Sequence, residues 1–343
     1  MKKRKGGRIA MTILCVFLGV VLAAMLGVTI YAQYMMGLVG RVEIGKEETL
    51  SEEELQQIQA DETVAPDETN APVMKEEDVD WGNEEQPVIE VSENIVNILL
   101  IGQDAREGEG RARSDSMILV TFNKEKGTIT MTSFLRDMYV RIPGYNDNKL
   151  NATYAAGGME LLNETLALNF GVEVDGNVEV DFSHFAEVID LLGGVDMELR
   201  NDEAKYINFK TERNELSAGM QHLDGEQALF YSRIRHLDAD ADFSRTNRQR
   251  KVINALIEKF RDTKLTTLLG LLDDLLPMVT TDLSNAEMIK YATELFPMLS
   301  GCQIISQRVP GDGQYQFATI RGMSCVIADM DAARELIAET MKD

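Results

Sequence analysis

Two near-continuous apolar runs constrain the fold of this chain more than any other feature of its sequence. Residues 95–101 contain one polar residue, Asn97, before Gly102 ends the run, and residues 117–122 form a second run of this kind. Runs so short and apolar are typical of strands that are buried on both faces. Residues 128–134 predict a third strand, joined to the second as a hairpin. We therefore expect a sheet with both faces covered.

Helices between further strands complete this prediction. Residues 159–168 and 183–192 have helical character, and residues 178–182 and 195–199 predict short strands around the second helix. Strands that alternate with helices favour an α/β fold. We predict a layered α-β-α sandwich with a central mixed sheet. Sites in such sheets lie beyond the strand ends, which is where Asp104 and Arg136 fall.

The N-terminus predicts a membrane anchor. Five basic residues among the first eight precede an uncharged run, residues 9–40. About 20 apolar residues cross a bilayer, and basic residues mark the cytoplasmic side. We expect a cytoplasmic tail (1–8), one transmembrane helix (9–34) and an extracellular remainder. A cleaved signal peptide is the alternative, but the run is long for one and lacks a clear cleavage site.

Composition then divides the extracellular part. Residues 41–93 hold 18 acidic and three basic side chains, which predicts a disordered, extended linker over 35–93, with a weak helical pattern in 47–60. The core follows at 94–262. Residues 263–343 predict a C-terminal extension packed on it, with helices at 265–276 and 285–299 and strands at 303–309 and 323–328. Cys302 and Cys325 fall at or in these strands, either bridged across a hairpin or unpaired in the core.

An arginine-rich stretch, residues 231–250, indicates an anion site. Its five arginines lie within 18 residues of an otherwise acidic domain: Arg233, Arg235, Arg245, Arg248 and Arg250. The arginine fork matches phosphate oxygens two at a time. A capping box at Asp224 and Gln227 predicts a helix that ends near Arg233, and a second helix begins near residue 243. We expect Arg245, Arg248 and Gln249 to share one face of that helix. The alternative is a solvated surface that pairs with intervening aspartates.

Two aspartates suggest a metal near this stretch. Asp104 ends the first predicted strand and Asp115 begins the second. Mg²⁺ takes one or two carboxylates together with phosphate oxygens. Taken singly, each aspartate is more typical of a strand-end cap. The net charge of -23 argues against a nucleic-acid partner.

The ordered set of motifs resembles the LytR-CpsA-Psr family. One motif is Leu135-Arg136-Asp137-Met138, where Leu135 stands in place of the family's usual proline. The others, in chain order, are residues 97–104, 113–117, 149–152, 192–195, 223–229, 233–235, 242–245 and 248–249. The match runs from about residue 94 to residue 260.

This resemblance implies an extracellular, membrane-anchored phosphotransferase of cell wall biogenesis. Members move a glycopolymer, such as wall teichoic acid or capsule polysaccharide, from a polyprenyl-pyrophosphate lipid onto peptidoglycan. It also implies an apolar tunnel for the prenyl chain. Carried over by position, Asp104 and Asp115 hold Mg²⁺, with Mn²⁺ as the alternative ion. The implied pyrophosphate ligands, with Arg113 beside them, are Arg136, Arg233, Arg235, Arg245 and Gln249.

The proton acceptor for the attacking hydroxyl stays open between Asp242 and Asp104. Two other functions stay open as well. One is a non-catalytic sensor or scaffold that binds the lipid-linked precursor, and the other is a polyprenyl-pyrophosphate hydrolase. The paired aspartates favour catalysis over a scaffold, because a scaffold has little use for a metal.

Overall fold

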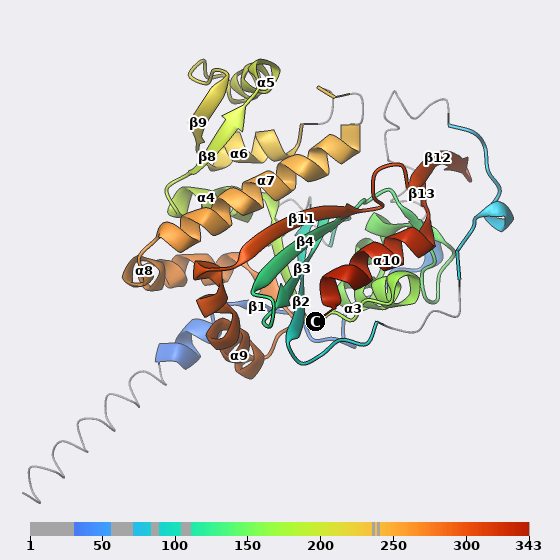
Figure 1. The fold of residues 1–343 in the computed structure, drawn as a ribbon, viewed down its shortest axis with the longest axis horizontal. Helices are drawn as coiled ribbons and strands as arrows, with labels where there is room; N and C mark the ends of the chain where they lie inside the picture. The colour runs from blue at the N-terminus through green and yellow to red at the C-terminus, as the bar shows by residue number, and fades with distance from the viewer. Residues whose placement is uncertain are drawn as a thin grey trace, which may run out of the picture.

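The computed structural model describes residues 31–55, 71–83, 89–103, 111–234, 237–238 and 241–342. Within these ranges, seven strands form a central mixed sheet (Figure 1). In spatial order they are β1 (Gly40–Arg41), β10 (Thr280–Thr281), β7 (Gly176–Asp181), β2 (Ile95–Gln103), β3 (Ser114–Asn123), β4 (Thr128–Phe134) and β11 (Gln303–Val309). β2 runs parallel to β7 and β4 parallel to β11, whereas β3 is antiparallel to both of its neighbours.

Helices cover both faces of this sheet, as the apolar runs predict. The α-helices described over their full length are α3 (Leu150–Phe170), α4 (Phe182–Leu191), α5 (Asn201–Thr211), α6 (Gly225–Ser232), α7 (Ala241–Asp262), α8 (Leu265–Leu275), α9 (Asn285–Leu295) and α10 (Met330–Met341). Figure 1 shows α3 and α10 on one side of the sheet and α4, α6 and α7 on the other. The α/β fold with a central mixed sheet is thereby confirmed.

Alternation along the strands divides the core into two layers, because successive side chains point to opposite faces. Leu99 and Met117 belong to the cluster that contains residues of α3 and α10. Ile118 and Val120 belong to a second cluster, which packs against Ile253 of α7. The layer under α7 contains the apolar cavity described below.

Three small sheets and three short 3-10 helices complete the described architecture. The small sheets pair β5 (Tyr139–Val140) with β6 (Asn148–Lys149), β8 (Val195–Leu199) with β9 (Gly219–Leu223), and β12 (Tyr315–Ile320) with β13 (Met323–Ala328). The 3-10 helices are η2 (Glu76–Asp78), η3 (Leu276–Met278) and η4 (Phe296–Ser300). β8 was predicted as a strand, but it pairs outside the central sheet. The segment 263–343 supplies two central strands, β10 and β11, beyond the packing that we expected of it.

The linker is a correction to the sequence-based expectation. Several of its described residues pack on the core, although others, such as Val73, are exposed. Leu55 is fully buried in the α3 layer, and the backbone N–H of Leu50 donates to the carbonyl of Ala156 at 2.8 Å. Further along, Trp81 stacks on Tyr139 with 6.0 Å between ring centroids. Acidic composition misled here because a few apolar side chains, spaced along the segment, find an existing surface to cover.

Two further expectations concern the N-terminus and the cysteines. No helix in the described ranges combines the length and apolar character that crossing a membrane requires; residues 9–30 of the predicted span lie outside those ranges. Cys302 and Cys325 are both buried and unbridged. The bridge hypothesis is wrong because β11, which follows Cys302, pairs with β4, while β13, which holds Cys325, pairs with β12.

Candidate active site beyond the strand ends

Side chains from the start of β3, an inner strand of the sheet, and from helices α4 to α7 line a cavity of about 420 Å³. We call it the cationic cavity, because Lys210, Arg233 and Arg245 line it against one carboxylate, Asp115. Its other lining residues are Phe182, Tyr206, Phe230 and Gln249. Four residues predicted for one site, Asp115, Arg233, Arg245 and Gln249, therefore meet in one place.

Two helix ends produce this convergence, as the sequence predicts. The capping box of α6 is present, with Asp224 accepting from the N–H of Gln227 at 2.9 Å, and Arg233 is the C-cap residue of the same helix. Arg245 and Gln249 lie four residues apart on α7, hence on one face. Arg245 is only 2% exposed. A guanidinium in this lining can donate to two oxygens of an anion at once, so its position suits a negatively charged ligand.

Arg136 joins the cavity through Asp115. Its Nη1 donates to Oδ1 of Asp115 at 2.7 Å, and its Nε donates to Oδ2 of Asp137 at 3.2 Å. Lys149 contacts the other oxygen of Asp137, also at 3.2 Å. These four side chains are at most 14% exposed. The guanidinium of Arg136 is thus oriented by two carboxylates at the end of β4.

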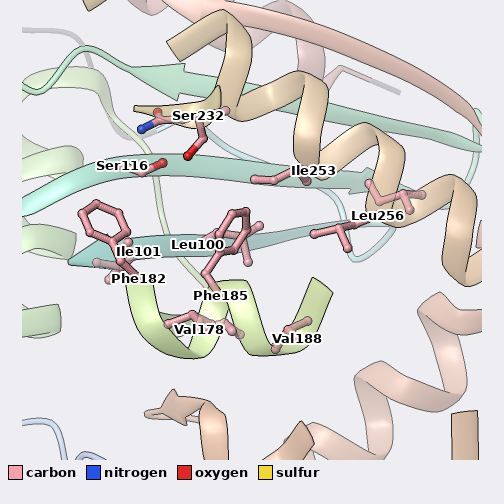
Figure 2. A pocket seen from close by; sticks show the side chains of 14 residues that line it. Leu100, Ile101, Ser116, Val178, Phe182, Phe185, Val188, Ser232, Ile253 and Leu256 are labelled. Carbon is pink, nitrogen blue, oxygen red and sulfur yellow. The ribbon is translucent and has the colours of Figure 1, made fainter. Parts of the chain in front are cut away.

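A second, apolar cavity of about 270 Å³ lies between α7 and α4, against strands of the central sheet (Figure 2). We call it the apolar cavity. Phe182 and Gln249 line both cavities, so the two adjoin. Ser116 and Ser232 lie at one end in Figure 2, and Val188 and Leu256 lie at the other. Its remaining lining residues are Leu100, Ile101, Gly102, Val178, Val180, Phe185, Ile253 and Ile257. The pair of cavities can accept a molecule with an anionic head and a long apolar tail.

Comparison with known proteins identifies the family. A profile of the LytR_cpsA_psr family matches residues 58–341. The chain belongs to this family. It is 33% identical over 250 residues to the polyisoprenyl-teichoic acid–peptidoglycan teichoic acid transferase TagU of Bacillus cereus, covering 72% of this chain and 78% of the relative. It is 34% identical over 242 residues to the corresponding transferase TagT of Bacillus subtilis, covering 67% and 74%.

Solved structures agree with this assignment. TagT bound to LIIa-WTA superposes with a TM-score of 0.60 at 29% identity, covering 76% of this chain and 94% of that one. The LytR-CPS2A-psr family protein YwtF (TagT) with bound octaprenyl pyrophosphate lipid gives 0.57 at 26% identity, with the same coverage. The LytR_cpsA_psr fold therefore extends over most of the described chain.

Not every predicted residue of this family site can be placed. Asp104 and Arg235 lie outside the described residues, as does the side chain of Asp242. Arg113 immediately precedes β3 and is half-buried.

The placement of Arg248 corrects the expectation that it shares a ligand-binding face with Arg245. Its Nε donates to Oε1 of Glu203 on α5 at 2.9 Å, and its Nη2 contacts Oδ2 of Asp238. Burial alone raises the pKa of Asp238, but hydrogen bonds from Arg200 and Arg248 outweigh it and hold that pKa below its usual range. Arg248 therefore ties α7 to α5 and to residue 238.

Arg250 lies outside the predicted ligand face, and it is not part of a solvated surface either. It is only 7% exposed and donates to the carbonyl of Gln307 on β11. Burial, reinforced by the nearby charge of Arg308, lowers the pKa of Arg250 to about 10. A change at this position is expected to weaken the contact between α7 and β11.

Sequence reasoning missed several lining residues. Lys210 and Tyr206 come from α5, which carries no motif, and no local signal points to them. The apolar lining had a signal: Phe182, Phe185 and Val188 recur at three-residue steps on α4. That spacing predicts a helix face directed at a core. It cannot show that the facing helix stops short of contact and leaves a cavity.

Proposed function

We propose that this protein is a phosphotransferase that moves a glycopolymer from a polyprenyl-pyrophosphate carrier onto peptidoglycan. The observation that carries the proposal is that the apolar and cationic cavities adjoin through Phe182 and Gln249. In the proposed complex the prenyl tail enters the apolar cavity and the pyrophosphate binds in the cationic cavity. The relatives are named for teichoic acid transfer to peptidoglycan, and one structural neighbour holds octaprenyl pyrophosphate.

The reaction follows from this placement. The oxygen of an acceptor sugar hydroxyl attacks the phosphorus that carries the glycopolymer, and a new phosphodiester bond forms. The bond from that phosphorus to the bridging oxygen breaks, and prenyl monophosphate leaves. The hydroxyl proton passes to a carboxylate, for which Asp242 and Asp104 are the candidates. Phosphoryl transfer depends mostly on positioning and charge neutralisation, which the arginines supply.

Each cation has a distinct role in the proposed complex. Arg245 and Arg233 line the cationic cavity directly, and Arg136 is held beside it by Asp115. The guanidinium of Arg233 also lies over the ring of Phe182, 4.6 Å from its centroid. Because Phe182 borders both cavities, this contact positions Arg233 where head and tail of the lipid meet. Arg113 and Arg235 complete the proposed set.

A divalent cation, Mg²⁺ or Mn²⁺, is part of the proposal. No group of three or more potential protein ligands occurs among the described residues. Asp115 is a hard oxygen donor in the cationic cavity, and one or two carboxylates suffice for Mg²⁺ when phosphate and water complete its shell. The carboxylate of Asp115 suits such an ion, and we propose Asp104, from its place in the family motif, as the second ligand. The ion would neutralise charge on the pyrophosphate oxygens.

The proposed location is the cell membrane, with a single pass near the N-terminus. The basic cluster followed by the uncharged run of residues 9–40 supports it. Residues 1–8 then lie in the cytoplasm, and the domain faces the extracellular side, where peptidoglycan is found.

Reconstitution tests the proposal. The full chain in detergent is mixed with a polyprenyl-pyrophosphate-linked teichoic acid precursor, peptidoglycan and Mg²⁺. We expect polymer to become covalently attached to peptidoglycan and prenyl monophosphate to accumulate in equal amount. Release of prenyl monophosphate without attachment of polymer to peptidoglycan identifies a hydrolase. Tight binding of the lipid-linked precursor without any product identifies a scaffold. Either result overturns the assignment.

A further inference from the structure

Three aromatic rings meet at the start of α7, outside both cavities. The ring of Phe243 stacks on Tyr315 of β12 with 4.4 Å between centroids. Phe317, also on β12, meets Tyr315 edge-on at 5.6 Å and Phe243 at 6.2 Å. The guanidinium of Arg308 lies over the Phe243 ring, 4.4 Å from its centroid. We call these four side chains the aromatic platform.

The outer ring of this platform faces solvent. Tyr315 and Phe317 occupy one face of β12, because Ala318 and Ile320 are fully buried on the alternate face. Phe317 is 40% exposed. A single exposed ring is ordinary on a protein surface. Here the ring belongs to a cluster of three rings with the guanidinium of Arg308 over Phe243, a composition that suits a partially polar ligand.

Strand pairing places the platform beside the candidate active site. Val309 pairs with Phe134 in the β11–β4 register, and the N–H of Leu135 donates to the carbonyl of Val309 at 3.0 Å. Arg136 is the next residue after Leu135, and Arg308 immediately precedes Val309. In Figure 1 the β12–β13 hairpin lies on the side toward which the N-terminal end of α7 points.

Helix geometry separates the platform from the cationic cavity. Phe243 and Arg245 are two residues apart on α7, so they lie about 200° apart around the helix and about 3 Å apart along it. Arg245 lines the cationic cavity with Gln249, whereas Phe243 carries the rings on the opposite face. The first turn of α7 therefore divides the two sites.

Reaction geometry decides what approaches from the platform side. In phosphoryl transfer the attacking and leaving oxygens lie roughly in line across the phosphorus. In the proposed complex the leaving prenyl phosphate points toward the apolar cavity, which shares Gln249 with the cationic cavity. The attacking hydroxyl must then come from the side away from that cavity.

We propose that Tyr315 and Phe317, supported by Phe243 and Arg308, form a stacking site for sugar rings of the acceptor glycan strand. The C–H face of a pyranose ring is apolar and lies flat on an aromatic ring, while its hydroxyl groups reach polar groups at the rim. Arg308, which also contacts Asp312, supplies such a group. This inference rests on the proposed function and adds the acceptor subsite to it.

Kinetics with two substrates test the assignment. The full chain and its Phe317→Ala variant are assayed with a polyprenyl-pyrophosphate-linked teichoic acid precursor and soluble peptidoglycan glycan strands. We expect the KM for the glycan strands to rise about three- to tenfold, while kcat and the KM for the lipid donor stay at parent values. Phe317→Leu keeps apolar bulk without a ring, so it should share the defect, whereas Phe317→Tyr should restore parent behaviour.

Phe296→Ala is the matched control, because Phe296 is 46% exposed on η4, away from this surface. Parent kinetics in both Phe317→Ala and Phe317→Leu overturn the platform. A raised KM for the donor instead assigns the rings to donor sugars and also overturns it. If the parent chain transfers no polymer, the proposed function itself has failed, which is a separate result.

Discussion

Replacing Arg248 by methionine should lower the free energy of unfolding of this protein. It should leave the proposed substrate contacts unchanged. The guanidinium of Arg248 is 4% exposed and donates to Oε1 of Glu203, to the carbonyl of Ile234 at 3.3 Å and to Asp238. Methionine preserves much of the apolar stem but removes all of these donors. The carboxylate of Glu203, 5% exposed, then stays buried without its closest cation.

The magnitude follows from burial. Removing one partner of a buried ion pair costs about 3–5 kcal/mol, because the remaining charge is left uncompensated. Arg200 moderates this loss, since it still contacts Asp238 at 2.6 Å and Glu203 at 3.7 Å. We therefore expect the lower end, about 3 kcal/mol, which lowers the ratio of folded to unfolded protein more than a hundredfold. Lys251→Met, an exposed position on the same helix, should cost well under about 1 kcal/mol.

Urea unfolding followed by tryptophan fluorescence measures this effect. Trp81 is the single tryptophan of the chain, and its stacking on Tyr139 ties its signal to the folded core.

The pKa of Asp238 is held below its usual range in the folded state. Such a group contributes stability above its unfolded pKa of about 3.9 and loses it as pH falls through the folded value. The difference between parent and Arg248→Met should accordingly shrink below about pH 4.

An Arg248→Met variant that unfolds at the parent's urea concentration at neutral pH would refute this reasoning. It would mean that water screens the contacts to Glu203 and Asp238 despite their burial. If the folded variant instead no longer binds the lipid-linked substrate while its stability is unchanged, Arg248 contacts the ligand, as the sequence predicted.

Four further predictions address the site. Arg245→Lys should lower transfer about ten- to a hundredfold with the fold intact, because lysine cannot make a two-pronged phosphate contact; urea unfolding checks the fold. Asp115→Asn and chelation should each lower transfer more than lipid binding, and indifference to both contradicts the metal. Val188→Trp should weaken binding of the prenyl donor more than tenfold, since excluding even two methylenes costs about 1.6 kcal/mol. Protease added to intact cells should cleave the acidic linker; protection until lysis contradicts the proposed topology.

Local sequence signals predicted most elements of the core. The strand at 303–309 and the strand at 128–134 match β11 and β4 residue for residue, and the capping box placed α6 correctly. These signals depend on neighbours in the chain, so they can be read without tertiary structure. The partner of each strand is not local. β8 was correctly predicted as a strand, but it pairs with β9 and not with the central sheet. Likewise, nothing in residues 303–309 shows that β11 pairs with β4.

The prediction of an extended linker was wrong in its described parts, because composition does not show what a segment can pack against. Composition predicts that an acidic segment cannot form a core of its own, and that inference is sound. It does not exclude docking on a core that already exists. Glu47 illustrates the difference: its Oε1 accepts from Arg111 at 3.1 Å and its Oε2 accepts from the N–H of Glu160 at 3.1 Å. An acidic residue that composition assigns to solvent is here 7% exposed.

Three arginines in the N-terminal half of α7, Arg245, Arg248 and Arg250, show where sequence reasoning stops. Their clustering correctly marked the place where two helix ends meet, but each guanidinium goes to a different partner. Arg245 lines the cationic cavity, Arg248 pairs with acids of α5 and residue 238, and Arg250 donates to β11. Helical spacing alone puts Arg248 with Arg245, because residues three apart are neighbours. A long side chain can nevertheless turn away from its neighbour on the helix when a buried carboxylate such as Glu203 lies within reach. The charged hydrogen bond to that carboxylate then decides where the guanidinium lies. In the proposed site, one of these three arginines, Arg245, faces the ligand, whereas Arg248 and Arg250 hold the helix that carries it.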